Sequence, residues 1–166
     1  MSQMPRRTFN VVHEPWIPCV YEGETLTREV GLREALADAH RIAELADPSP
    51  LVTAALHRLL LAVLHRVFGP SSLEDWSLLY RAGRFDTGSI ELYLKRWSHR
   101  FKLFDNHYPF YQTPDLPVNL ATTVAKLGYE FSSGNNPTLF DHSVDDAPRP
   151  MSPATAARLL VAHQAF

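Results

Sequence analysis

The segment 51–68 constrains the fold of this chain most, because it is the most apolar stretch and leaving all of it in water would be costly. Four polar or charged side chains interrupt it: His57, Arg58, His65 and Arg66. A membrane-spanning helix needs about 20 mostly apolar residues. The segment therefore predicts a helix, apolar nearly all round, that forms the centre of the core of a soluble domain.

Length and charge exclude several classes of protein. A chain of 166 residues with 45% apolar residues fits one domain and needs no disulfide or metal ion to fold. Cys19 is the single cysteine, which excludes an internal disulfide and a cysteine-rich zinc site. The net charge of −2 argues against a protein that coats nucleic acid by bulk charge, but leaves local recognition open. No signal-peptide pattern follows the N-terminus, so we expect a cytoplasmic protein without a membrane segment.

The spacing of apolar and turn residues predicts an α+β fold that is mainly α-helical. Residues 9–26 are β-like around a turn at Gly23, which predicts a small N-terminal β-hairpin packed on a helical core. Helices are expected over about 31–46, 51–68, from Ser71 or Ser72 to Gly83, from Asp86 to about Phe101, and from Ser152 to Phe166. Residues 104–118 predict an irregular connection, and about 120–127 a short helix.

A long irregular loop is expected near 128–150, since no periodicity occurs there. A loop of more than about 20 residues in a compact domain is usually functional or disordered. Its amide and hydroxyl side chains suit phosphates, sugars and base edges, and an apolar pair follows them. Phe140 either folds back onto its own domain or fills a pocket of a partner. The polar residues are Ser132, Ser133, Asn135, Asn136 and Thr138, followed by Leu139, Phe140, Asp141 and His142.

Basic residues cluster around the third and fourth predicted helices. These residues can form a basic face, but a solvated helix surface explains the same pattern. The residues are Arg81, Arg84, Arg96, Arg100 and Lys102.

No catalytic pattern is present in the sequence. Eight histidines are scattered without a His-x-x-x-His or His-Glu-x-x-His pair, so we expect no metal and no cofactor. Cys19 falls in a predicted strand, where a buried and inert thiol is expected. We therefore expect a protein that is not an enzyme.

Several segments together resemble the CasA family, the large subunits of the type I-E CRISPR complex Cascade. The most specific are the Trp16-Ile17-Pro18 start and the loop Asn135-Asn136-Pro137-Thr138-Leu139-Phe140-Asp141. The matching segments are Phe9 to Val12 with Glu14 to Pro18, Gly31 to Leu36 with Ala39 to Ile42, Ala55 to Arg66, His107 to Gln112, Gly134 to His142, and Thr155 to Arg158 with His163 to Phe166.

The resemblance implies a non-catalytic subunit in antiviral defence that binds RNA and DNA. Family members lie beside the 5′ handle of the guide RNA (crRNA), support recognition of double-stranded target DNA through its protospacer-adjacent motif, and recruit a helicase-nuclease. Their loop matching 131–146 contacts the RNA handle and a neighbouring Cascade subunit. Carried over to this sequence, that role falls on Asn135, Asn136, Thr138, Leu139, Phe140 and Asp141, with His142 beside them.

Two departures from the family pattern shape the expectations. Some members have a Cys-x-x-Cys that helps to bind zinc, where this chain has Met151-Ser152-Pro153-Ala154, so no metal is carried over. Members are about three times as long, so we interpret residues 1–166 as a single domain, part of the family's N-terminal domain and truncated at the C-terminus. Two alternative functions remain: a generic helical protein-interaction domain, or a small histidine-dependent metal hydrolase.

Overall fold

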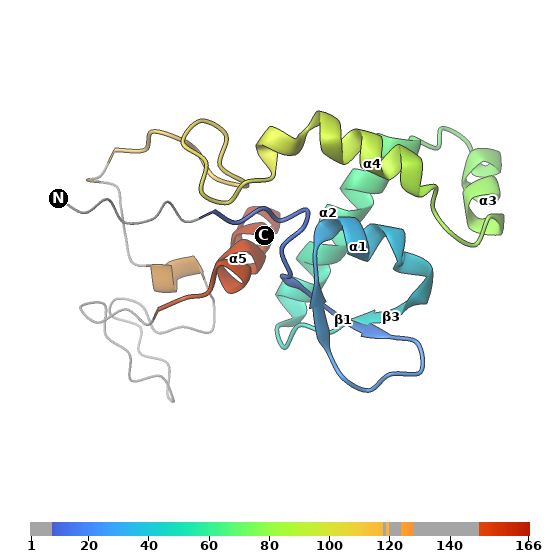
Figure 1. Cartoon of the computed structure of the whole chain (residues 1–166), viewed down its shortest axis with the longest axis horizontal. Helices are drawn as coiled ribbons and strands as arrows, with labels where there is room; N and C mark the ends of the chain where they lie inside the picture. The colour runs from blue at the N-terminus through green and yellow to red at the C-terminus, as the bar shows by residue number, and fades with distance from the viewer. Residues whose placement is uncertain (1–7, 118, 120–123, 128–149) are drawn as a thin grey trace.

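The computed structural model describes residues 8–117, 119, 124–127 and 150–166. A three-stranded antiparallel sheet lies against helices at one side of the molecule (Figure 1). The central strand β1 (Ile17–Tyr21) pairs with β2 (Arg28–Val30) and, on its other edge, with β3 (Ile42–Leu45). The predicted hairpin is confirmed: Gly23 adopts a φ of 78°, which an L side chain rarely does. The second strand begins at Arg28, later than expected, and leaves Leu26 exposed.

The predicted helix over 31–46 is wrong beyond its first two turns. Helix α1 covers only Leu32–Ala37, a 3₁₀ turn η1 follows at Ala39–Arg41, and the remainder is strand β3. The second edge of β1 explains the difference, because its backbone groups need partners and Ile42–Leu45 supply them. Leu45 lies in the hydrophobic core. Long-range pairing thus overrides the helical spacing of the alanines.

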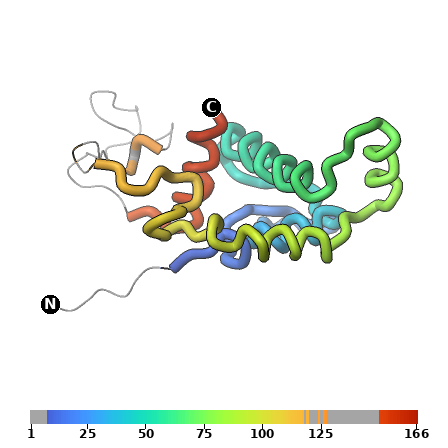
Figure 2. Tube along the Cα trace, turned by 90° about the horizontal axis from the view of Figure 1, so that it is seen from above, coloured from blue at the N-terminus to red at the C-terminus, as the bar shows by residue number. Residues whose placement is uncertain are grey.

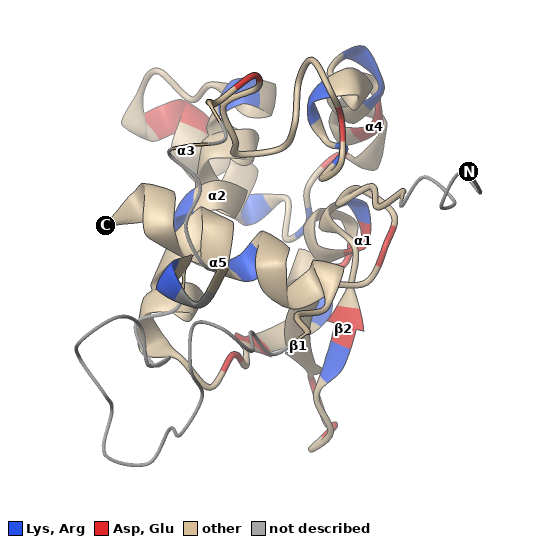
Figure 3. Cartoon of the chain, turned by 90° about the vertical axis from the view of Figure 1, so that its left-hand side faces the viewer, with Lys and Arg blue, Asp and Glu red and all other residues tan. Residues whose placement is uncertain are grey.

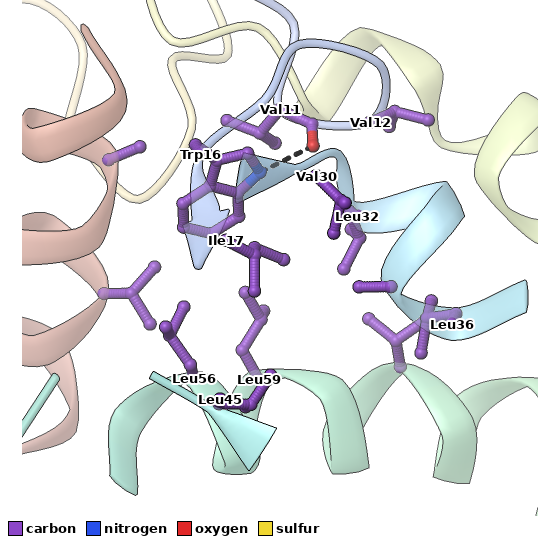
Figure 4. Packing of buried hydrophobic residues seen from close by; sticks show 14 of the residues in the cluster. Val11, Val12, Trp16, Ile17, Val30, Leu32, Leu36, Leu45, Leu56 and Leu59 are labelled. Atoms are coloured by element: carbon purple, nitrogen blue, oxygen red, sulfur yellow. Dashed lines mark hydrogen bonds between the residues drawn. The ribbon is translucent and has the colours of Figure 1, made fainter. Parts of the chain in front are cut away.

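Helix α2 (Pro50–Phe68) forms the centre of the core, as predicted. It packs against α5 (Pro153–Ala165), α4 (Thr87–Arg96) and β3. Part of its apolar surface is nevertheless accessible, since Leu61 is 54% exposed. By length and composition α2 can cross a membrane. Its buried residues Leu56 and Leu59 instead pack in the core with Ile17 and Leu36 (Figure 4).

The predicted N-caps of three helices are confirmed, with small shifts of boundary. The Ser72 hydroxyl accepts from the Asp75 amide at 3.0 Å and starts α3 (Leu73–Arg81). Asp86 caps α4 in the same way, and the Ser152 hydroxyl caps α5. Helix α4 ends at Arg96, before the predicted end near Phe101, and a 3₁₀ turn η2 (Ser98–Arg100) follows it. The irregular connection predicted over 104–118 is confirmed for its described part, residues 104–117. Within the part expected as a short helix, the structure describes the 3₁₀ turn η4 (Val124–Leu127).

One charged side chain joins α5 to the sheet. The Arg158 guanidinium donates to the Trp16 carbonyl at 2.8 Å and to Asp47 at 3.0 Å, and pairs with Glu29. The Arg158 side chain is 15% exposed and that of Asp47 is 8% exposed. The Trp16 indole is fully buried and donates to the Val11 carbonyl (Figure 4). This ion-pair network holds α5 against the sheet.

Candidate nucleic-acid interface

The segment that follows α4 is held firmly by the N-terminal residues. Leu103 donates its amide to the Phe9 carbonyl at 2.9 Å, and Val11 donates to the Phe101 carbonyl at 3.0 Å. Phe101 and Leu103 are buried, so the residue between them, Lys102, projects into solvent. This alternation of buried and exposed residues places the Lys102 side chain in solvent, on a backbone that hydrogen bonds hold rigid.

Cationic and aromatic side chains gather at this end of α4. The Arg100 guanidinium lies 4.2 Å from the centre of the Tyr108 ring, and His99 packs edge-on against the same ring at 5.4 Å. The Arg96 guanidinium lies 5.8 Å from the centre of the Trp97 ring. Tyr108 is 46% exposed, so the ring remains accessible. We call Arg96, Arg100, Lys102 and Tyr108 the α4 basic cluster.

Acidic groups border the α4 basic cluster. A depression of about 440 Å³ is lined by Lys102 and His107, but also by Glu14 and Asp105. The Asp105 carboxylate accepts from the amides of His107 and Tyr108, both at 2.9 Å, and these hydrogen bonds lower the pKa of Asp105. The Asp105 carboxylate therefore fixes the loop that carries Tyr108. Its negative charge also limits the positive field of the neighbouring cations, so this surface presents an exposed aromatic ring more than a broad positive patch.

The predicted five-residue basic face is divided in two by α4. Arg81 and Arg84 lie before this helix and line a groove beside α3, whereas Arg96, Arg100 and Lys102 lie at or beyond its other end. Ten helical residues span roughly 15 Å. Figure 3 shows basic positions on the ribbon of α4. The five residues are close along the chain, but α4 lies between the two groups.

The predicted docking-loop residues lie outside the described residues. These are Asn135, Asn136, Thr138, Leu139, Phe140, Asp141 and His142. The structure does describe both flanks of the long loop, η4 before it and α5 after it. Their contact with each other places the two flanks near one another.

Catalytic and metal candidates find little support in the described part of the chain. Cys19 is fully buried in β1, and burial raises the pKa of its thiol to about 11, as expected of an inert cysteine. Within residues 8–117, 119, 124–127 and 150–166, no three His, Cys, Asp or Glu side chains gather as metal ligands would.

Sequence reasoning missed Tyr108 as a member of the α4 basic cluster, and His99 as the ring that packs against it. Tyr108 approaches Arg100 only because residues 101–110 double back, with Phe110 donating its amide to the Lys102 carbonyl. The interleaved run Arg96-Trp97-Ser98-His99-Arg100 was the available signal, since alternating cations and aromatics are typical of single-stranded nucleic-acid surfaces.

Comparison with known proteins identifies the family. The sequence model of the family described as CRISPR-associated protein Cse1 matches residues 10–166. A curated relative, the CRISPR-associated protein CasA/Cse1 of Thermus thermophilus, is 48% identical over 95% of this chain and 31% of its own length. The chain thus spans about a third of that relative.

Solved structures agree with this result. The structure of Thermus thermophilus CasA (Cse1) matches with a TM-score of 0.78 and 42% identity, over 95% of this chain and 31% of that one. Cse1 from Acidimicrobium ferrooxidans matches with a TM-score of 0.79 and 31% identity, over 96% and 29%. A chain of a CRISPR RNA-guided surveillance complex matches with a TM-score of 0.83 and 27% identity, over 93% and 34%. This chain belongs to the CRISPR-associated Cse1 (CasA) family.

Proposed function

We propose that the chain is part of a non-catalytic subunit of a type I-E CRISPR RNA-guided surveillance complex, acting in the cytoplasm. The observation that carries the proposal is the 48% identity to CasA/Cse1 over 95% of the chain. It is supported by the likeness to a chain of a surveillance complex, with a TM-score of 0.83. In such a complex base pairing reads the long target sequence, while protein reads a short motif and holds the nucleic acid.

The proposed docking element is the loop that contains Asn135, Asn136, Thr138, Leu139, Phe140, Asp141 and His142. Amide and hydroxyl groups of this loop hydrogen-bond the phosphates and sugars of the 5′ handle of crRNA. The apolar pair Leu139 and Phe140 enters a pocket of a neighbouring Cascade subunit. Docking there supports recognition of double-stranded target DNA at its protospacer-adjacent motif and recruitment of the helicase-nuclease.

The α4 basic cluster provides a second nucleic-acid contact. Arg100 covers one face of Tyr108, which leaves the exposed part of the ring for a base and the guanidinium for a phosphate. Lys102 adds a phosphate contact from a rigid backbone. The negative charges of the neighbouring Asp105 and Glu14 confine the positive potential to a small area, in agreement with the net charge of −2.

The docking loop is tested by the double change Leu139→Ala, Phe140→Ala. Co-purification with crRNA-loaded Cascade subunits is expected to fall at least about tenfold, since removed apolar anchors typically dominate binding energy. The matched control is Leu92→Ala, which truncates a leucine that is 73% exposed on α4. Circular dichroism of the isolated variants checks the fold. Undiminished co-purification of the double variant refutes the loop assignment.

The α4 basic cluster is tested by changing Arg96, Arg100 and Lys102 together to alanine. We expect weaker binding of a labelled crRNA handle, and a slope of log K against log salt that is smaller by about one per lost phosphate contact. Arg81→Ala with Arg84→Ala is the matched control, because these two arginines lie at the other end of α4. Equal losses per removed charge in the two variants indicate bulk charge and contradict a specific surface.

A further inference from the structure

Helix α3 is amphipathic, yet none of its nine residues is buried. Trp76 is 53% exposed and Tyr80 is 75% exposed. Their rings stack on each other, with centres 5.4 Å apart and planes 11° apart. Figures 1 and 2 both show α3 at one end of the molecule, beyond the ends of α2 and α4. Among the described residues, none covers its apolar side as the other long helices are covered.

A groove of about 730 Å³ separates α3 from α2. Leucines from both helices contribute to its walls, namely Leu61 and Leu64 from α2 and Leu79 from α3. At one end Phe68 and Phe85 stack with centres 5.6 Å apart. Trp76 and Tyr80 complete the wall on the α3 side. The groove thus offers contiguous aliphatic and aromatic surface of the kind that binds an amphipathic helix.

The charged residues that line the groove are all of one sign. Arg81 and Arg84 lie along it, with His40 and His65 as further polar groups. Among its described lining residues there is no Asp or Glu. A ligand with acidic residues beside an apolar face is complementary to this rim.

Two other occupants fit the groove less well. A second copy of the chain would place Arg81 and Arg84 against the same basic rim, which like charges disfavour. Single-stranded nucleic acid would satisfy the arginines, but would leave Leu61, Leu64 and Leu79 without apolar partners. A helix that carries both leucine-like and acidic side chains satisfies the walls and the rim together.

We infer that the groove between α2 and α3 is a docking site for an amphipathic helix with acidic residues flanking its apolar face. This site is distinct from the α4 basic cluster and the docking loop, and it does not depend on the proposed function. The apolar side chains of the helix enter between Leu61 and Trp76, and its carboxylates pair with Arg81 and Arg84.

Three synthetic peptides of about 14 residues, or four helical turns, test the inference by fluorescence anisotropy with the 166-residue chain. The first carries leucine at i, i+3, i+4 and i+7 and glutamate elsewhere. The second replaces each glutamate by lysine. The third has the composition of the first, with its leucines spread around the helix. We expect the first to bind at least about tenfold more tightly than either of the others, because only it meets both requirements.

Two groove variants and two matched controls locate the binding. The first variant is Trp76→Ala, and the second combines Arg81→Glu with Arg84→Glu. Each is expected to weaken binding of the first peptide at least about tenfold. Leu92→Ala and Lys95→Glu change exposed residues of α4 outside the groove and should leave binding of the first peptide unchanged. The two groove variants change exposed residues, and their thermal unfolding is compared with that of the unmodified chain.

Several results would overturn the inference. They are equal binding of the acidic and lysine peptides, equal binding of the scrambled peptide, or no binding of the first peptide at about 1 mM, the weak limit of specific affinity. Displacement of the first peptide by a single-stranded oligonucleotide of equal charge identifies a nucleic-acid site instead. A concentration-dependent dimer that releases the peptide identifies the groove as a contact between copies.

Discussion

Replacement of Arg158 by methionine is expected to loosen α5 from the sheet. Methionine keeps the flexible apolar stem but removes the guanidinium. The side chain is only 15% exposed, so water replaces the lost contacts poorly. Asp47, 8% exposed, then loses its cationic partner, and the Trp16 carbonyl loses a donor at 2.8 Å.

The magnitude follows from the burial of each partner. Removing one member of a buried ion pair costs about 3–5 kcal/mol. Asp47 retains one hydrogen bond, from the Ser49 amide, which places the expected loss near the lower end, at about 3 kcal/mol. Glu29 is 40% exposed and adds at most about 1 kcal/mol. For a chain of this length, 3 kcal/mol corresponds to a fall in Tm of roughly 6–12 °C.

Thermal and urea unfolding of the two variants Arg158→Met and Arg33→Met measure this effect. Arg33 forms an ion pair with Glu91 in which both side chains are 50% exposed, so its loss should cost about 1 kcal/mol or less. A double-mutant cycle with Asp47→Asn should show a coupling of about 1–3 kcal/mol. If Arg158→Met destabilises no more than Arg33→Met, or the coupling is absent, the reasoning fails.

Three further outcomes are expected. Gly31→Ala should lower the free energy of unfolding by about 2 kcal/mol, because the new Cβ would lie 2.6 Å from the Val12 carbonyl oxygen. Gly88→Ala is the control, since the atom nearest to its new Cβ would be 3.6 Å away. Equal urea midpoints for the two variants would contradict the predicted clash. Cys19 should resist iodoacetamide near pH 8 until the protein unfolds, because burial raises the pKa of its thiol to about 11; rapid labelling of folded protein would disprove the burial. Hydrogen bonds from Ser71 hold the pKa of the Asp75 carboxyl below its ordinary value of 3.8, so its contribution to stability is present above that value and is lost as pH falls through the lower folded-state pKa. Asp75→Asn should therefore weaken the acid dependence of the urea midpoint below about pH 4, and an unaltered dependence would argue against this role.

Local signals in the sequence were sufficient for most helices and insufficient for the sheet. Ser72, Asp86 and Ser152 each cap a helix with a side chain that bonds an amide three residues on, a contact that depends only on nearby residues. Strand β3 was missed because the spacing of the alanines there fits a helix. The segment forms a strand instead because it pairs with the second edge of β1. Strand pairing depends on a partner some 25 residues earlier, which periodicity does not report.

The candidate site shows the same division. The basic residues were found from sequence, but their separation into two groups depends on how α4 lies between them. Likewise, the anchoring role of Arg158 depends on Trp16 and Asp47, neither of which is near it in sequence. The exposed groove beside α3 was also unforeseen, because its amphipathic pattern predicts burial and the described residues do not cover it.

The Arg158 network also bears on how the protein is made. Its bond to the Trp16 carbonyl joins residues 142 positions apart. At ribosomal rates that interval takes on the order of ten seconds, during which β1 and β2 exist without the helix that completes their core. Until α5 emerges, the buried surface of Leu56 and Ile17 is open to other chains. Folding of this domain during synthesis should therefore finish late, and the nascent chain should be a good substrate for chaperones until residue 158 has left the ribosome.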